Sequence, residues 1–177
     1  MSRDGFSCGD YAFIKIRIKL LSPTAKAPRY MTAGAAGADV FADLSRIADG
    51  EAHFGPAWGG DCASGPNGLW CVTLREGTAR IPLGFAVEIP HGWVGLLKGR
   101  SGEARRGNDA HVAYIDSDYR GECSMLLHVG RGGVVVKSGD RVGQIAFVPA
   151  PQFDLVVVDE LSETVRGQGG FGSTGSR

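Results

Sequence analysis

The chain has 177 residues, 43% of them hydrophobic, which is enough for one buried core but too short for two full domains. Its 19 basic and 19 acidic side chains balance, so no net charge favours nucleic acid or a membrane surface, and we expect neither as a partner. No stretch approaches the about 18 apolar residues of a membrane span, and the N-terminus lacks the apolar block of a signal peptide, so we expect a soluble, cytoplasmic protein.

Short apolar runs separated by glycine predict an all-β domain, because the 28 glycines let the backbone turn often. The clearest strand is residues 13–21, where Lys15, Arg17 and Lys19 alternate with apolar residues and predict one buried and one exposed face. Further strands are predicted at residues 38–42, 69–74, 79–89, 93–98, 110–115, 122–129, 133–136, 141–148 and 154–158. With only a short helical turn expected at residues 101–106, the pattern is typical of an antiparallel jelly-roll-like sandwich.

Two segments lack apolar periodicity. Residues 45–78 are rich in glycine and proline and are interpreted as a long surface loop or hairpin insertion, a decoration of the domain, although such loops are often functional. The stretch after residue 160 should not pack as core. We therefore predict a single domain over residues 1–160, with a loop insertion at about 45–78, and a flexible C-terminal arm over residues 161–177.

The four cysteines are scattered along the chain without a C-x-x-C pair: Cys8, Cys62, Cys71 and Cys123. This spacing argues against both a disulfide framework and a zinc site. We expect reduced thiols and no metal bound by cysteine.

Residues 166–175, with the sequence RGQGGFGSTG, form the first candidate for chemistry. Glycines let successive N–H groups converge on an anion, Ser173 and Thr174 add donors, and Arg166 adds a guanidinium fork for a terminal phosphate. Composition alone favours a disordered low-complexity tail. Phe171 argues against that alternative, because an aromatic among glycines is suited to stacking on a base.

Two shorter segments are ambiguous when each is taken alone. Asp116 follows the apolar Ile115 at a predicted strand end, where a carboxylate can act as general base on a water, although Asp and Ser also cap ordinary turns. Arg100 and Ser101 precede the expected helical turn and suit an anion, although the same residues make an ordinary helix cap.

Together and in this order, five segments resemble the motifs of the trimeric dUTPase family. They are residues 36–40 (AGADV), 99–102 (GRSG), 115–121 (IDSDYRG), 139–144 (GDRVGQ) and 166–175. The resemblance extends from residue 36 to the C-terminus, interrupted by residues 45–78. It implies a homotrimer of jelly-roll (β-clip) subunits with shared active sites, in which the arm of one subunit closes over a site built by two others.

The resemblance also implies the reaction and its cofactor. Asp116 would activate a water for attack on the α-phosphorus of dUTP, giving dUMP and pyrophosphate, which lowers dUTP and supplies dUMP for thymidylate synthesis. Mg²⁺ would bridge the triphosphate oxygens without direct protein ligands, while Asp39 and Gln144 hold the hydrated ion through water.

Substrate contacts follow from the same resemblance. Tyr119 would lie under the deoxyribose and leave no room for a 2′-hydroxyl, and the main chain at Tyr114 and Ile115 would pair with uracil. The remaining predicted contacts hold the phosphates or cover the base: Arg100, Ser101, Gly102, Gln144, Arg166, Phe171, Gly172, Ser173 and Thr174. The uracil hairpin departs from the family pattern, because Ala113 and Tyr114 replace a glycine and a small aliphatic residue.

Two alternatives remain open. A dCTP deaminase-like or bifunctional enzyme shares the fold, but that family places a catalytic glutamate in the strand after the third motif, where this chain has Met125, Leu126 and Leu127. A regulatory protein on a dUTPase scaffold could use residues 45–78 to bind a partner. Retention of Asp116, Tyr119 and the whole arm argues against loss of catalysis, but not against a second role.

Overall fold

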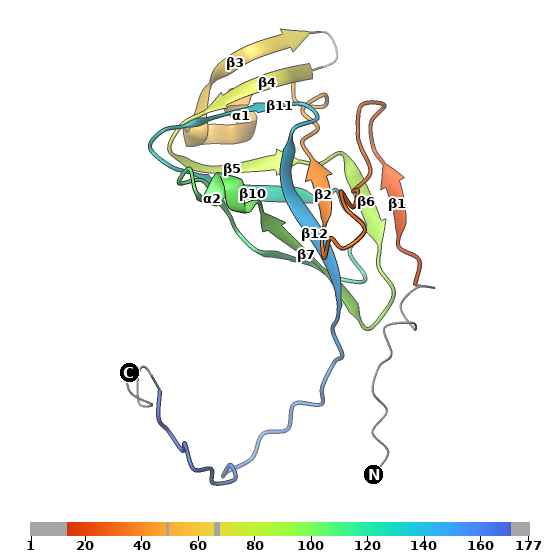
Figure 1. The fold of residues 1–177 in the computed structure, drawn as a ribbon, viewed down its shortest axis with the longest axis vertical. Helices are drawn as coiled ribbons and strands as arrows, with labels where there is room; N and C mark the ends of the chain where they lie inside the picture. The colour runs from red at the N-terminus through yellow and green to blue at the C-terminus, as the bar shows by residue number, and fades with distance from the viewer. Residues whose placement is uncertain (1–13, 49, 66–67, 171–177) are drawn as a thin grey trace.

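The structure is a computed structural model that describes residues 14–48, 50–65 and 68–170, with the side chains at 51–52 and 61–69 outside this description. Its regular structure is almost entirely β (Figure 1). The strands are β1 (Arg17–Leu20), β2 (Ala38–Phe41), β3 (Trp58–Gly65), β4 (Gly68–Leu74), β5 (Gly77–Pro82), β6 (Phe85–Glu88), β7 (Trp93–Gly99), β8 (Asp109–Ala110), β9 (Ala113–Ile115), β10 (Ser124–Val129), β11 (Val134–Lys137) and β12 (Arg141–Pro149). The helical elements are short: α1 (Gly50–Phe54), the 3-10 turn η2 (Gly55–Ala57) and α2 (Ser101–Ala104).

Among the described residues, the strands form sheets with the orders β1-β6, β5-β10-β8, β11-β4-β3 and β2-β12-β7-β9. Every pairing between these strands is antiparallel. The prediction of an all-β, antiparallel fold is therefore confirmed.

One core cluster joins all four of these sheets, with Phe85 on β6 as the contribution of the β1-β6 sheet. Val40 on β2, Leu74 on β4, Ile81 on β5, Leu97 on β7 and Ile145 on β12 all belong to it, each with no exposed surface. Burying a side chain of this size contributes about 1.5–3 kcal/mol. The hydrophobic core therefore supports the sheet β2-β12-β7-β9, which carries most of the predicted motif segments.

Within residues 45–78, the antiparallel strands β3 and β4 form the hairpin that was one of the two expectations, and β4 confirms the predicted strand at 69–74, whereas α1 and η2 were not predicted. Strand β4 also pairs with β11. Phe54, Ala57, Val72 and Leu74 are buried in the core. This segment is therefore an integral part of the packed body and not a decoration on its surface.

The predicted terminal strands are wrong in part. In β1 every residue is exposed, including Ile18 at 38% and Leu20 at 46%, so the expected buried face is not buried within this chain. The reason is that β1 pairs with β6 in a two-stranded sheet. Residues 154–158 form no strand, and Leu155 and Val157 are 89% and 98% exposed. Figure 1 shows the chain after β12 running away from the β body.

Two predicted strands are each divided in the structure. Residues 79–89 form β5 and β6, which pair with β10 and β1 and are separated by a turn at Gly84, where φ is +68°. A positive φ suits glycine, because other residues are strained there. Residues 110–115 are divided between β8, which pairs with β10, and β9, which pairs with β7.

The cysteines correct one expectation. Cys71 is disulfide-bonded, so the prediction of reduced thiols is wrong at this position. Cys123 is free and buried. Burial, together with the charge of Glu122, raises the pKa of the Cys123 thiol to about 12.

Within the described part of the chain, none of the helices has the length and apolar character needed to cross a membrane.

Candidate functional site

The sheet β2-β12-β7-β9 brings the predicted motif segments to defined positions. β12 lies between β2 and β7, and Gln144 on β12 is opposite Asp39 on β2. β7 ends directly before Arg100, and β9 ends directly before Asp116. The first, second and fourth motifs therefore meet around β12, while the third motif follows the edge strand.

Arg100 and Asp116 leave this sheet at opposite ends of β7, because β7 and β9 are antiparallel. Ile115 at the end of β9 is paired with Gly95, whereas β7 continues to Gly99. The four residues from Gly95 to Gly99, at about 3.3 Å each, separate these positions by about 13 Å. The structure thus places the carboxylate of the third motif away from the arginine of the second motif of the same chain.

Arg141 connects the first, second and fourth motifs. Its Nη1 atom lies 3.1 Å from Oδ2 of Asp39, and its carbonyl accepts a hydrogen bond of 3.3 Å from Nη1 of Arg100. Both arginines line a cavity of about 350 Å³, together with Arg106 and Asp140. Guanidinium groups around a hollow of this kind can bind phosphate oxygens through charge-assisted hydrogen bonds.

Gln144 is half-buried and packs closely on the first motif. A Cβ atom on Gly37 would lie 2.8 Å from Oε1 of Gln144, so a larger residue there would require the Gln144 side chain to shift. Ser101 and Gly102 at the start of α2 are exposed and accessible to a ligand.

Asp116 is exposed and lines a second cavity, of about 630 Å³. Tyr114, which is 71% exposed, and Trp93 line the same cavity. Ile115 is only 7% exposed and anchors the strand end in the core. An accessible carboxylate on a rigid strand end can accept a proton from a water molecule.

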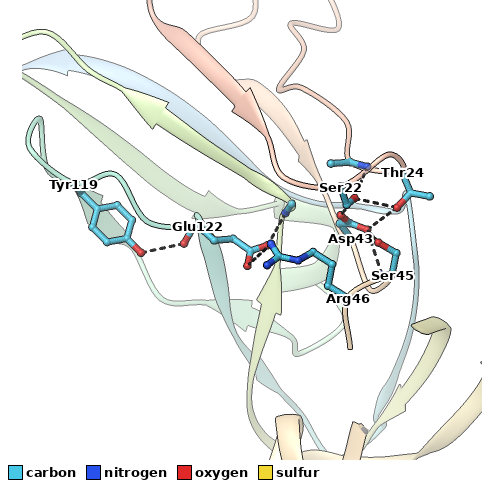
Figure 2. Close-up of polar contacts among 9 residues, drawn as sticks. Ser22, Thr24, Asp43, Ser45, Arg46, Tyr119 and Glu122 are labelled. Carbon is cyan, nitrogen blue, oxygen red and sulfur yellow. Dashed lines mark hydrogen bonds and ion pairs between the residues drawn. The ribbon is translucent and has the colours of Figure 1, made fainter. Parts of the chain in front are cut away.

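The turn after Asp116 is closed by its own hydrogen bonds. The Tyr119 amide donates to the Asp116 carbonyl at 3.2 Å, and Nη1 of Arg120 donates to the carbonyls of Ser117 and Tyr119 at 2.7 and 2.9 Å. The Tyr119 hydroxyl donates to the main-chain carbonyl of Glu122 at 3.1 Å (Figure 2). These bonds hold Tyr119 in the turn that follows Asp116, with 44% of its surface exposed.

A second polar cluster in Figure 2 surrounds the buried Asp43. Its Oδ1 accepts from the hydroxyls of Thr24 and Ser45 at 2.9 and 2.7 Å, and its Oδ2 accepts from the Ser22 hydroxyl. Burial alone would raise the pKa of Asp43, but the hydrogen bonds from Ser22, Ser45 and Thr24 outweigh it and hold the pKa below its ordinary value. The cluster lies against Gly84, where an added Cβ would meet the Asp43 side chain, and so stiffens the β5–β6 turn.

Some predicted residues are not brought together in the single chain. The cavity at Asp116 and the cavity at Arg100 share no lining residue among those described. Arg166 lies on the exposed extension, where its Nε donates to the Gly169 carbonyl at 2.8 Å. Four predicted arm residues lie outside the described residues: Phe171, Gly172, Ser173 and Thr174.

The residues around Arg100 fit a hydrated magnesium ion better than a protein-ligated metal. No group of three or more His, Cys, Asp or Glu side chains suited to a metal occurs in the described ranges. Asp39 offers one carboxylate, already paired with Arg141, and Gln144 offers one amide oxygen opposite it. Mg²⁺ commonly keeps several waters and binds through few carboxylates plus substrate phosphates, which matches this donor set.

The sequence reasoning missed two residues that organise the site. Arg141 lies within the fourth motif, and its position three residues before Gln144 was the available signal for its role beside Asp39. Glu122, directly after the third motif, carries no such signal, because its contacts are with segments distant in the sequence.

Comparison with known proteins gives a consistent result. Residues 70–175 match the family model for dUTPase. A deoxyuridine 5′-triphosphate nucleotidohydrolase of Desulfitobacterium hafniense is 38% identical over 170 residues, which cover 92% of this chain and 97% of the relative. The enzyme of the same name from an Anaeromyxobacter species is 37% identical over 164 residues, covering 90% of this chain and 94% of the relative.

Solved structures of phage proteins share the fold. A variant of the Staphylococcus bacteriophage 80alpha dUTPase, solved with dUpNHpp, has a TM-score of 0.71 at 24% identity and covers 91% of this chain and 98% of its own. A variant dUTPase of phage phi11 of S. aureus, described with a structural Mg(II) ion, has a TM-score of 0.63 at 22% identity and covers 82% of this chain and 97% of its own.

Proposed function

This chain belongs to the dUTPase family, and we infer that it hydrolyses dUTP to dUMP and pyrophosphate by attack of water on the α-phosphorus. The observation that carries the function is the near full-length similarity to two bacterial dUTP nucleotidohydrolases. The accessible carboxylate of Asp116 in its own cavity supports the mechanism. Neither the deaminase nor the non-enzymatic alternative has an observation in its favour.

Asp116 is the general base in this proposal. Its carboxylate accepts a proton from the attacking water, and the oxygen of that water becomes bonded to the α-phosphorus while the bond to the pyrophosphate oxygen breaks. A positioned general base contributes about 10²–10⁴-fold to rate. The exposure of Asp116 and its place at the end of β9 support this role, because water and substrate can both reach it.

The phosphates are held by the groups around β12. Arg100, Ser101 and Gly102 bind the phosphate chain, and Asp39 and Gln144 would hold hydrated Mg²⁺ through water. The ion, when bound, would supply positive charge that offsets the charge of the phosphates. Support comes from the three arginines that line one cavity, Arg100, Arg106 and Arg141, and from the pairing of Asp39 with Arg141.

The nucleoside is selected at the third motif. Tyr119 packs under the deoxyribose and leaves no room for a 2′-hydroxyl, while main-chain groups at Tyr114 and Ile115 pair with uracil. The arm then covers the site, with Phe171 over the base and the other arm residues on the phosphates: Arg166, Gly172, Ser173 and Thr174. The exposure of Tyr119, at 44% in the turn that directly follows Asp116, supports this arrangement.

The protein functions as a homotrimer with shared sites in this proposal. The two cavities lie apart in one chain, so a complete site needs groups from more than one subunit. Apolar residues left exposed after β12, including Phe153 at 77% and Leu155 at 89%, gain burial on a neighbouring subunit. Location in the cytoplasm remains a prediction.

The proposal is tested by offering dUTP, dCTP, dTTP and UTP with Mg²⁺ and identifying the products by chromatography. The expected result is dUMP and pyrophosphate from dUTP, with little turnover of the others. Asp116→Asn should bind nucleotide and lose turnover about 10²–10⁴-fold. Asp118→Asn, the same change in the same turn, should lose far less, and equal losses in both variants would exclude a specific base. Ammonia release from dCTP would establish the deaminase alternative.

A further inference from the structure

We propose that Glu122 is a positioning residue for sugar selection. Its side chain fixes the end of the third motif to the β5–β6 turn, so that its main-chain carbonyl can hold the hydroxyl of Tyr119 in place. The inference rests on the proposed function, in which Tyr119 excludes a 2′-hydroxyl, and it assigns that selectivity to a residue that does not touch the substrate.

The orientation of Tyr119 depends on the residues just after it. Its hydroxyl donates to the Glu122 carbonyl at 3.1 Å (Figure 2). A Cβ atom on Gly121 would collide with the phenol group, so the ring lies directly across the glycine. Tyr119 is nevertheless 44% exposed. The ring is therefore fixed on one side by the turn and free on the other to contact a sugar.

The side chain of Glu122 adds an anchor close to the carbonyl that receives Tyr119. Oε1 of Glu122 accepts a hydrogen bond of 3.0 Å from the Gly84 amide, and Oε2 lies 3.7 Å from Nη1 of Arg46 (Figure 2). The Glu122 side chain is only 27% exposed, whereas Arg46 is 52% exposed. The bond to Gly84 is thus the stronger anchor, because exposed ion pairs at this distance contribute little.

The next residue strengthens the same attachment. The Cys123 amide donates to the Phe85 carbonyl at 2.9 Å, and its carbonyl accepts from the Leu83 amide at 3.1 Å. The end of the third motif is therefore attached to both sides of Gly84. Because the Cys123 amide and the Glu122 carbonyl share one planar peptide group, the bond to Phe85 orients this carbonyl, and the Glu122 side chain adds a second anchor on the side of Tyr119.

The β5–β6 turn is a rigid support for this anchor. The Gly84 carbonyl accepts from the Leu21 amide at 2.8 Å, and the Asp43 amide donates to the Pro82 carbonyl at 2.9 Å. The Asp43 cluster packs against Gly84 from the other side. Because both sides of the turn are fixed, displacement at Glu122 should be taken up by the third motif, where Tyr119 lies.

Loss of the Glu122 side chain should therefore relax sugar selection before it abolishes catalysis. Discrimination against a substrate with an added hydroxyl by shape alone is limited to about 10²-fold. It requires that the side chain that excludes the hydroxyl is held in a fixed position. If Tyr119 can shift, the 2′-hydroxyl of UTP is accommodated and the sugar of dUTP is held less firmly. The effect should raise the KM for dUTP more than it lowers kcat.

The test compares kcat/KM for dUTP and UTP in three variants. Glu122→Ala should lower the ratio of dUTP to UTP by about tenfold or more. Glu122→Gln keeps an oxygen acceptor for Gly84 and should preserve the ratio within about threefold. Glu88→Ala removes an equally charged side chain, exposed and paired with Arg17, and should leave the ratio unchanged.

Tyr119→Phe keeps the test decisive if Glu122→Ala does not fold. It removes only the hydroxyl and should lower the same ratio with little change in melting temperature. An unchanged ratio in folded Glu122→Ala or in Tyr119→Phe would overturn the inference, as would equal losses in Glu122→Gln and Glu122→Ala. Wild-type protein that fails to hydrolyse dUTP, or does not prefer it to UTP, would refute the proposed function itself.

Discussion

Two inactive variants should restore activity when they assemble in the same oligomer. Asp116→Asn removes the proposed base, and Arg100→Gln removes a phosphate ligand. The two residues follow strand positions about 13 Å apart along β7 and line different cavities. A site that uses both groups therefore takes them from two subunits.

The expected magnitude follows from this geometry. Asp116→Asn alone should lose about 10²–10⁴-fold in turnover. Arg100→Gln alone should lose about 10–100-fold, since a hydrogen bond from a charged group is worth about 1.5–3 kcal/mol. In a random one-to-one trimer mixture, a given site receives an intact Asp116 and an intact Arg100 in about one case in four, so about a quarter of wild-type turnover should return.

The assay is pyrophosphate release from dUTP after the two variants are unfolded and refolded together. The control mixes wild-type protein with the double variant Asp116→Asn/Arg100→Gln, where shared sites leave about a quarter of full activity and single-chain sites leave about half. Turnover that stays at the sum of the two separate variants, with mixed trimers present, would refute the shared site.

Three other predictions concern the support around the site. Gly84→Ala should lower the free energy of unfolding by about 2–5 kcal/mol, because φ is +68° and the new Cβ meets Asp43. Gly92→Ala, at φ +80° with no neighbour within 4 Å, should cost only about 1–2 kcal/mol in urea unfolding, and equal losses would contradict the Asp43 contact. Because the pKa of Asp43 is lowered, its ionised form stabilises the fold above the ordinary aspartate pKa, and this stabilisation is lost as the pH falls through the lowered pKa. The difference in free energy of unfolding between wild type and Asp43→Asn should therefore shrink on acidification, and a constant difference would contradict this role of Asp43. With a thiol pKa of about 12, Cys123 should escape alkylation at pH 8 in the native protein and react in urea. Peptide mass spectrometry measures both, and rapid labelling of the native protein would show that the thiol is accessible.

The local alternation of apolar and polar residues was sufficient to predict most of the strands. In β10 the alternation of Met125, Leu127 and Val129 with exposed neighbours is the period that the sequence displays. Local pattern failed where a strand had to change sheets. At Gly84 a continuous apolar run is divided, because its two halves pair with β10 and β1, and pairing partners far along the chain are not visible in a local window.

Part of residues 45–78 was misjudged for a related reason. Glycine and proline mask the buried positions Phe54 and Ala57, whereas Val72 lies in the predicted strand at 69–74, whose pairing with β11 is not visible in a local window. Residues 154–158 show the opposite error, since their apolar character predicted a strand that has no pairing partner among the described residues.

Site residues that lie within a contiguous motif could be predicted from the sequence. Residues whose role depends on contacts between distant segments could not. Asp116 and Arg100 could be selected from their own segments. Glu122 could not, because its anchor is the amide of Gly84, whose position is set by the β5–β6 turn.

The central claim is that water attacks the α-phosphorus of dUTP, and isotope labelling tests it most directly. Hydrolysis of dUTP by the wild-type protein in water enriched in oxygen-18, followed by mass spectrometry of both products, locates the bond that forms. The account predicts that the label enters dUMP and that pyrophosphate remains unlabelled. Label in pyrophosphate would place the attack on the β-phosphorus and contradict the mechanism.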